Sequence, residues 1–284
     1  MWTVLKAMDE GSAEPFIARL MIGILELRDH HIQARMQSQS QLEPMRKEFD
    51  DLYGPVLDAM FVARKAAASI RDAVAQHQQK VRSGEIVGWQ RNALEIHESI
   101  NSQLQDDLGR FLNGAVRAIK LLQPAAAHLG TDVGGLFVKD LNHEKRMRQL
   151  EAAGRSPLAE YLRRCRAEWS ERLVKRRNSL EHEGWVLGSV TYVPSADRTV
   201  TMAEPTIDSV GVSNWVTRQV AHVLAFVEEI MADAFANTLP GELTLVEIPA
   251  ADRDLTQPRR FRLGFPALEN VVRWKLHYDS TGFK

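Results

Sequence analysis

Three side chains near the middle of the sequence could carry out chemistry on a phosphate ester. Arg177, Asn178 and His182 lie in the stretch RRNSLEHEGW, residues 176–185. A guanidinium binds phosphate oxygens through a planar fork of N–H donors. An imidazole titrates near neutral pH and can take up or deliver a proton. This stretch therefore combines a group that binds an anion with a group that moves a proton.

The sequence around these three residues is strongly basic. Within residues 160–178, basic residues outnumber acidic ones by seven to three. The basic residues are Arg163, Arg164, Arg166, Arg172, Lys175, Arg176 and Arg177. A phosphodiester would therefore meet positive charge close to His182, although the net charge of the chain is -1. We expect Arg172, Lys175 and Arg176 to contact such a substrate.

The order of these residues resembles the signature of the HEPN superfamily (higher eukaryote and prokaryote nucleotide-binding domains). That signature is an Arg, then a polar residue, then a His four to six positions on, late in a helical bundle. The resemblance covers residues 158–185. It implies an all-helical domain that commonly pairs with a second copy and, in many members, a metal-independent RNA endonuclease. Carried over, it makes Arg177 the phosphate binder, Asn178 the orienting residue and His182 the proton-transfer group.

From this resemblance we expect a homodimer that acts on RNA or binds a nucleotide, with no cofactor and no bound metal. His182 would transfer the proton of an attacking ribose 2′-hydroxyl, and Arg177 would stabilise charge on the phosphorane. Asn178 would hold the imidazole or a phosphate oxygen. A regulatory protein partner is a further expectation, and binding of free nucleotides without turnover remains open.

The same stretch is also typical of a helix end. Gly184 has the residue type that adopts the left-handed conformation after a helix, and Trp185 could pack on Leu180. His182 in the last turn would interact favourably with the helix dipole. In this alternative the basic residues form a solvated face, and the protein is a non-catalytic helical interaction or assembly protein.

The spacing of apolar residues places the motif on a long helix. Ser156 and Pro157 are typical of helix starts, and an apolar stripe follows them. The stripe consists of Leu158, Leu162, Cys165, Trp169, Leu173 and Leu180. Because His182 lies about 180° around the helix from Leu173, the motif lies away from the main core face.

Three earlier helices are predicted from apolar residues at intervals of three and four. They cover residues 13–37, 42–83 and 86–123. We expect Gly54 and Pro55 to kink or split the second helix, because the residue before a proline avoids the helical region. Pro124 would close the third.

After Gly184 the apolar spacing changes from helical to alternating. Alternation on both sides of a turn at residues 194–197 predicts a β-hairpin. Residues 212–239 return to a helix that is apolar over a broad face and therefore buried. Residues 243–247 and 272–278 are predicted strands, which we expect to join the hairpin in one small antiparallel sheet.

These elements define a mainly α fold. We expect an up-down bundle of four long helices, an additional buried helix and a small antiparallel β element near the C-terminus. Residues 1–185 would form the bundle that carries the motif. Residues 186–284 would pack on it as an appendage rather than as an independent domain.

Composition and missing motifs exclude several classes of protein. The chain has 284 residues, of which 44% are hydrophobic and 26% charged, an ordinary globular composition. Its only cysteine, Cys165, excludes an internal disulfide and a cysteine-built zinc site within one chain. The sequence contains no Walker loop, no dinucleotide-binding GxGxxG and no GxSxG elbow. We expect neither a signal peptide nor a membrane span, and therefore a cytoplasmic protein.

A second Arg-Asn pair occurs at Arg91 and Asn92, followed by His97. If a helix covers residues 86–123, His97 falls on its apolar stripe. We therefore expect a hydrogen-bonded core histidine and no catalytic role for this pair.

Two further groups of residues could bind ligands. Asp29, His30 and His31 could suggest a metal, but adjacent helical residues face different ways, so we expect no metal site. The run of arginines and phenylalanines at residues 259–265 could stack nucleic-acid bases. It is more typical of an edge strand protected by charge.

Overall fold

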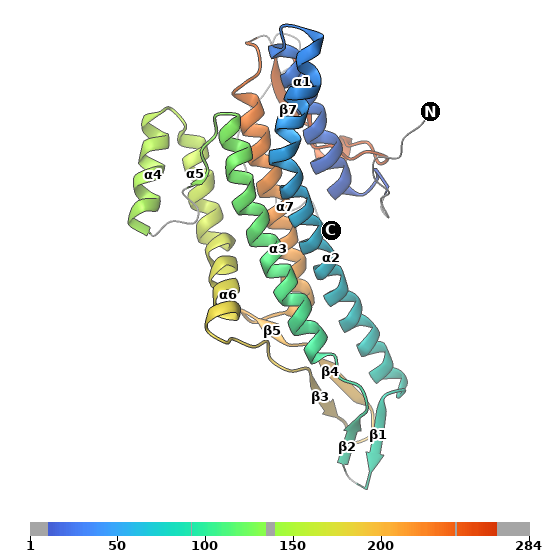
Figure 1. Cartoon of the computed structure of the whole chain (residues 1–284). Coiled ribbons are helices and arrows are strands. Elements are labelled where there is room, and N and C mark those ends of the chain that lie inside the picture. The colour runs from blue at the N-terminus through green and yellow to red at the C-terminus, as the bar shows by residue number, and fades with distance from the viewer. Residues whose placement is uncertain (1–10, 92, 135–139, 242, 266–284) are drawn as a thin grey trace. The chain divides into compact units, whose positions relative to one another are not determined.

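The chain folds mainly into helices, as its sequence predicts. The structure, a computed structural model, describes residues 11–91, 93–134, 140–241 and 243–265 (Figure 1). Its α-helices are α1 (Ile24–Arg35), α2 (Leu42–Ser83), α3 (Asn101–His128), α4 (Asp140–Ala152), α5 (Ser156–Cys165), α6 (Glu171–His182) and α7 (Val212–Ala236). Two π-helical segments, η1 (Ile17–Gly23) and η4 (Arg166–Ser170), lead into α1 and α6. Short 3₁₀ turns are η2 (Gln39–Gln41) and η5 (Ala250–Asp252).

The described strands form small antiparallel pairs. The pairs are β1 (Val87–Gln90) with β2 (Ala93–Ile96), β3 (Thr191–Pro194) with β4 (Val200–Ala203), β5 (Thr206–Ile207) with β6 (Val210–Gly211), and β7 (Thr244–Glu247) with β8 (Phe261–Gly264). The predicted hairpin is confirmed as β3–β4, with Tyr192 opposite Met202. The expected common sheet is wrong for the described strands, because β7 pairs with β8 and not with the hairpin. Residues 272–278 lie outside the described residues.

The chain divides into two compact units, each assembled from segments that are distant in the sequence. The first unit comprises Met1–Leu57, Ile119–Glu168 and Val223–Lys284, and the second comprises Asp58–Ala118 and Trp169–His222. Both units draw on segments from either side of residue 185. The partition into a bundle of residues 1–185 and an appendage of residues 186–284 stays a prediction.

The second unit is a bundle made from parts of α2, α3, α6 and α7. Gly114 of α3 lets two helices approach closely, since a Cβ there would lie 2.9 Å from the backbone nitrogen of Ala63 in α2. Phe111 of α3 meets Trp215 of α7 edge to face, with ring centroids 6.0 Å apart. Leu173 anchors α6 and is fully buried. These contacts position the face of α6 that carries the motif.

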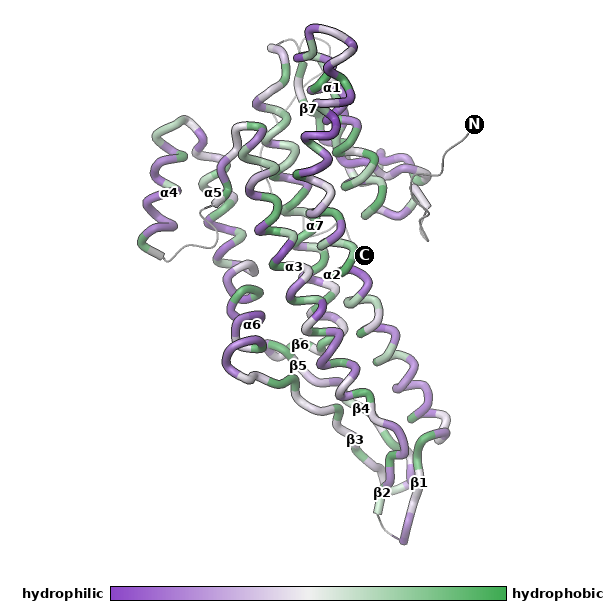
Figure 2. Tube along the Cα trace, viewed as in Figure 1, coloured by the Kyte–Doolittle hydropathy of each residue, from purple (hydrophilic) through white to green (hydrophobic). Residues whose placement is uncertain are grey.

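The first unit surrounds the second half of α7. Tyr161 of α5 stacks on Phe226 of α7 with ring centroids 6.1 Å apart. The hydroxyl of Tyr53 in α2 donates to the carbonyl of Leu20 in η1 at 3.1 Å. By contrast, α4 is mostly hydrophilic (Figure 2). Among its described side chains only His143 and Met147 are buried, so α4 contributes little to the core.

Helix α2 runs through Pro55 without a break, so the helix is not split there, and the expected kink stays a prediction. Proline removes one backbone hydrogen bond from this helix of 42 residues. Tyr53, Val56 and Met60 are buried around that position. Their packing outweighs the local loss, because tertiary contacts supply most of the stability of helices in proteins.

The predicted third helix begins later and ends later than expected. Strands β1 (Val87–Gln90) and β2 (Ala93–Ile96) pair with each other where the helix was expected to begin, and α3 starts only at Asn101. Pro124 does not close α3, which continues to His128. The helix ends where Gly130 takes a φ of +85° and the Thr131 N–H reaches the Ala126 carbonyl at 2.9 Å. A left-handed glycine with such a bond is a regular helix terminator.

The second half of α7 is buried, yet it carries three acidic residues. Glu228, Glu229 and Asp233 are at most 7% exposed. Among the described residues no helix combines the length and apolar character needed to cross a bilayer. The acids of α7 therefore need partners inside the protein.

Candidate functional site

The three motif residues lie at the C-terminal end of α6, which follows α5 and η4. Leu158, Leu162, Cys165, Trp169 and Leu173 are all buried, as their spacing predicts. Leu180 is half-buried over Gly109 of α3, where an added methyl group would lie 3.8 Å from its Cδ2. The apolar stripe thus fixes α6 and leaves the motif at the margin of the bundle.

Arg177 is held by three acceptors of its own chain. Its Nε donates to Oδ1 of Asn113 at 3.1 Å, and its Nη1 donates to Oδ1 of Asn178 at 3.2 Å. Its Nη2 pairs with Oε2 of Glu181 at 2.6 Å. The side chain is 25% exposed, so one edge of the guanidinium can still meet solvent. The amide oxygen of Asn178 orients this arginine.

His182 is the last residue of α6, and its side chain is 66% exposed. Its Nε2 lies 3.8 Å from Oε2 of Glu181, the same oxygen that pairs with Arg177. The guanidinium and the imidazole therefore converge on one carboxylate. Glu181 was missed by sequence reasoning, although an acid four residues after an arginine on a helix is a well-known pairing pattern.

The end of α6 also has the geometry of a helix terminator. Gly184 takes a φ of +67°, as the alternative interpretation predicts. The Trp185 N–H donates to the Ser179 carbonyl at 3.0 Å. The guanidinium of Arg176 lies 4.5 Å from the centre of the Trp185 ring and pairs with Asp208 at 2.8 Å. Arg176 thus covers Trp185 and already has an anionic partner.

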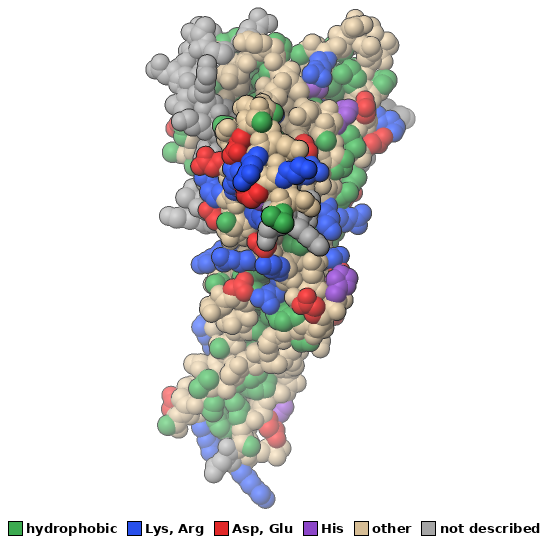
Figure 3. Space-filling view, turned by 90° about the vertical axis from the view of Figure 1, so that its left-hand side faces the viewer, with side chains coloured by type: hydrophobic (Ala, Val, Ile, Leu, Met, Phe, Trp, Pro, Cys, Tyr) green, Lys and Arg blue, Asp and Glu red, His purple; other side chains and the backbone are tan. Residues whose placement is uncertain are grey.

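Most of the seven basic residues within residues 160–178 have acidic neighbours. Lys175 pairs with Glu171 at 2.7 Å, and Arg163 pairs with Glu151 at 2.6 Å. Figure 3 shows blue and red side chains lying close together on the face that includes α4 and α5. In the described structure Arg172 is exposed and makes no side-chain ion pair. The excess of basic residues in the sequence therefore gives a weaker positive field than their number suggests.

The arginine of the second Arg-Asn pair lies in a turn and not on a helix. Arg91 has a φ of +55° between β1 and β2, and His97 follows β2. His97 is exposed, so the expectation of a core histidine is wrong. The apolar residues at positions 86–96 alternate in a hairpin, whereas the prediction assumed a helical period.

One of the two histidines near the N-terminus is part of the packing. His31 is buried, and its Nδ1 lies 2.7 Å from the hydroxyl of Thr238. Burial, together with the charge of Arg35, lowers the pKa of His31 to about 4. Among the described residues no group of three or more potential ligands could hold a metal ion.

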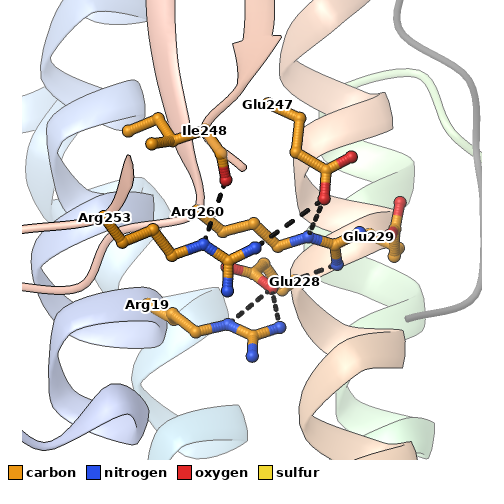
Figure 4. A network of polar contacts seen from close by, with 7 residues as sticks. All are labelled: Arg19, Glu228, Glu229, Glu247, Ile248, Arg253 and Arg260. Atoms are coloured by element: carbon orange, nitrogen blue, oxygen red, sulfur yellow. Dashed lines mark hydrogen bonds and ion pairs between the residues drawn. The ribbon is translucent and has the colours of Figure 1, made fainter. Parts of the chain in front are cut away.

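One arginine of the run at residues 259–265 lies inside the protein. Arg260 is fully buried, and its Nε donates to Oε1 of Glu247 at 2.8 Å. It also contacts Glu228 at 3.4 Å and pairs with Glu229 (Figure 4). Arg19 of η1 donates its Nε to Glu228 at 2.9 Å. The central arginine of this run is therefore part of a buried ionic network and cannot contribute to a surface that stacks bases.

Burial changes the protonation of this network. It raises the pKa of Glu229 to about 8, against the opposing effect of the Arg260 charge. For Arg260 burial disfavours the charge, but the carboxylates of Glu228, Glu229 and Glu247 outweigh it and raise the pKa. Sequence reasoning missed these acids, although charges within an otherwise apolar helix are a signal for buried partners.

No protein-family model, no curated protein and no solved structure matches this chain.

Proposed function

We propose that the chain is a HEPN-like protein that binds the phosphate of RNA or of a nucleotide at the end of α6 and cleaves RNA without a metal ion. The convergence of Arg177 and His182 on one oxygen of Glu181, at 2.6 and 3.8 Å, carries this proposal. Side chains that meet at one carboxylate can also meet at one phosphate, because both ligands present anionic oxygens to the same donors.

In the proposed reaction a substrate phosphate replaces the Glu181 carboxylate on Arg177. His182 accepts the proton of the ribose 2′-hydroxyl while that oxygen attacks phosphorus, and the bond from phosphorus to the 5′-oxygen breaks. The protonated His182 of the second copy donates a proton to the departing 5′-oxygen, and the products are a 2′,3′-cyclic phosphate and a 5′-hydroxyl. Arg177 stabilises the added charge on the phosphorane oxygens. In a homodimer, a second copy would place another Arg177 and His182 across the substrate.

An RNA cleavage assay in the presence of a chelator tests this proposal. His182→Ala should slow cleavage by about a hundredfold or more, the usual range for a lost general acid or base. Arg177→Ala should have a comparable effect. Arg117→Ala and His97→Ala are matched controls, since both residues are exposed in the second unit and lie outside the motif. Unchanged cleavage in both motif variants would remove the mechanism.

The helix terminator favours a second candidate function, that of a non-catalytic helical interaction or assembly protein. The specific observation is the left-handed Gly184 with the bond from the Trp185 N–H to Ser179. On this account Arg176 and Trp185 close the helix, and the motif has no substrate. A wild-type protein that neither cleaves nor binds RNA, but forms a defined assembly in mass photometry, would favour it.

A further inference from the structure

A polar groove of about 410 Å³ lies in the second unit, away from the residues of the motif. One wall is the face of α2 between Lys65 and Lys80. The other is the chain around the start of α3, from Glu98 to Gln103. Within the unit a hydrogen bond joins the two helices next to the groove, since the hydroxyl of Ser69 in α2 donates to Asp107 in α3 at 2.7 Å. This bond helps to set the distance between the two helices that form the groove.

His77 lies in this groove and has an unsatisfied ring nitrogen. The residue is 1% exposed, and its Nε2 lies 2.6 Å from the hydroxyl of Tyr192. Its Nδ1 is buried and has no hydrogen-bond partner. Oε1 of Glu98 lies 3.9 Å from Nδ1, too far for a hydrogen bond. Because buried polar atoms in native proteins nearly always have a partner, this nitrogen points to a missing ligand group.

The charges of the lining cancel. Lys65 and Lys80 supply two positive charges, and Asp72 and Glu98 supply two negative ones. Lys80 and Glu98 pair at 2.7 Å. Lys65 and Asp72 are exposed, and no ion pair joins either of them to another described residue. Neither a polyanion nor a polycation matches such a lining, whereas a molecule that carries both signs does.

The start of α3 adds a second site for negative charge. The helix begins at Asn101, and Ile100 and Gln103 line the groove. The first turn of a helix presents free backbone N–H groups and the positive end of the helix dipole, which favour a carboxylate. Two alanines and one isoleucine are the only apolar lining residues. The groove thus has no surface for a large apolar body.

We propose that this groove binds a small zwitterion of amino-acid or dipeptide size. Its ammonium pairs with Asp72, and its carboxylate lies at the first turn of α3 beside Lys80. A polar group of the ligand that approaches His77 and Glu98 from the groove satisfies the free Nδ1. This inference does not rest on the proposed activity on RNA, because no residue is shared between the two sites.

Thermal unfolding of the full chain, followed in the presence of each of the twenty amino acids and a set of Gly-X dipeptides, tests the proposal. At least one compound should raise the melting temperature in a saturable way, as any ligand of the native state does. Asp72→Asn should weaken that binding about tenfold, the usual effect of removing one charged hydrogen bond. Asp106→Asn is the matched control, since Asp106 is exposed on α3 and does not line the groove.

Two modified probes sharpen the test. The N-acetylated and the C-amidated forms of the best compound each lack one charge and should bind at least about tenfold more weakly. His182→Ala should leave binding unchanged, which separates this site from the one on α6. The proposal is overturned if no zwitterion raises the melting temperature, if the modified probes bind equally well, or if Asp72→Asn and Asp106→Asn behave alike.

Discussion

Replacing Arg260 by methionine should strongly destabilise the first unit. The guanidinium is fully buried and contacts Glu228, Glu229 and Glu247. Methionine keeps an unbranched chain of similar length but leaves these carboxylates without their shared counter-charge. Removing one partner of a buried pair costs about 3–5 kcal/mol. Because Arg19 still holds Glu228, we expect a loss within that range rather than above it.

Urea unfolding of wild type and Arg260→Met measures this loss. A change of about 3–5 kcal/mol should appear as a lower midpoint with an unchanged slope. Arg262→Met is the control, since Arg262 lies exposed in β8, two positions after Arg260, and its replacement should cost about 0.5 kcal/mol or less. Equal midpoints for Arg260→Met and Arg262→Met would refute the ionic network as a source of stability.

The same network predicts a dependence on pH. The pKa of Glu229 is about 8 in the folded protein and 4.5 as its ordinary value. The folded state thus holds a proton that the unfolded state releases, so this contribution to stability is complete below pH 4.5 and is lost as the pH rises toward 8. From pH 4.5 to pH 8, at about 1.4 kcal/mol for each pH unit, the loss is on the order of 5 kcal/mol. Glu229→Gln should flatten stability between pH 5 and 8; a variant that follows the wild-type curve would refute the raised pKa.

Three further predictions concern the second unit. Glu181→Gln should tighten the binding of a short uncleavable RNA several-fold in fluorescence anisotropy, because the carboxylate that competes with phosphate for Arg177 is gone. Glu183→Gln makes the same charge change nearby, and an equal gain in affinity there would exclude a specific role for Glu181. Gly114→Ala should lower the free energy of unfolding by about 1–3 kcal/mol, because the new Cβ would lie 2.9 and 3.0 Å from backbone atoms of α2. Gly109→Ala should be tolerated, since its Cβ would lie 3.8 Å from Leu180. Similar melting temperatures for the two variants would contradict the close approach of α2 and α3. Burial lowers the pKa of His222 to about 4 in the folded protein. The protein therefore loses stability as the pH falls from 6.5 toward 4, because protonation of His222 favours the unfolded state. In circular dichroism at pH 4.5, His222→Phe should unfold less readily than wild type.

The sequence alone was sufficient for the parts of the fold that depend on local patterns. The stripe from Leu158 to Leu173, the hairpin around residues 194–197 and the buried helix near residue 212 all appear as predicted. The left-handed Gly184 was also predictable, because a helix end selects its residue types within one turn. Local geometry and apolar spacing act over a few residues, and a single sequence displays them directly.

Tertiary structure decided which charges are exposed and which are compensated. Arg260 looked like a surface residue in its run of arginines, yet it lies against acids of α7 that are distant in the sequence. Arg177 is oriented by Asn113, which lies 64 positions earlier in the chain. Such pairings arise from the packing of helices and leave no periodic signal, because a charge and its partner can occur at any separation. The helical spacing of the sequence is therefore enough to bring Arg177 and His182 to Glu181, whereas only the tertiary structure places Asn113 against Arg177 and leaves Nδ1 of His77 unsatisfied.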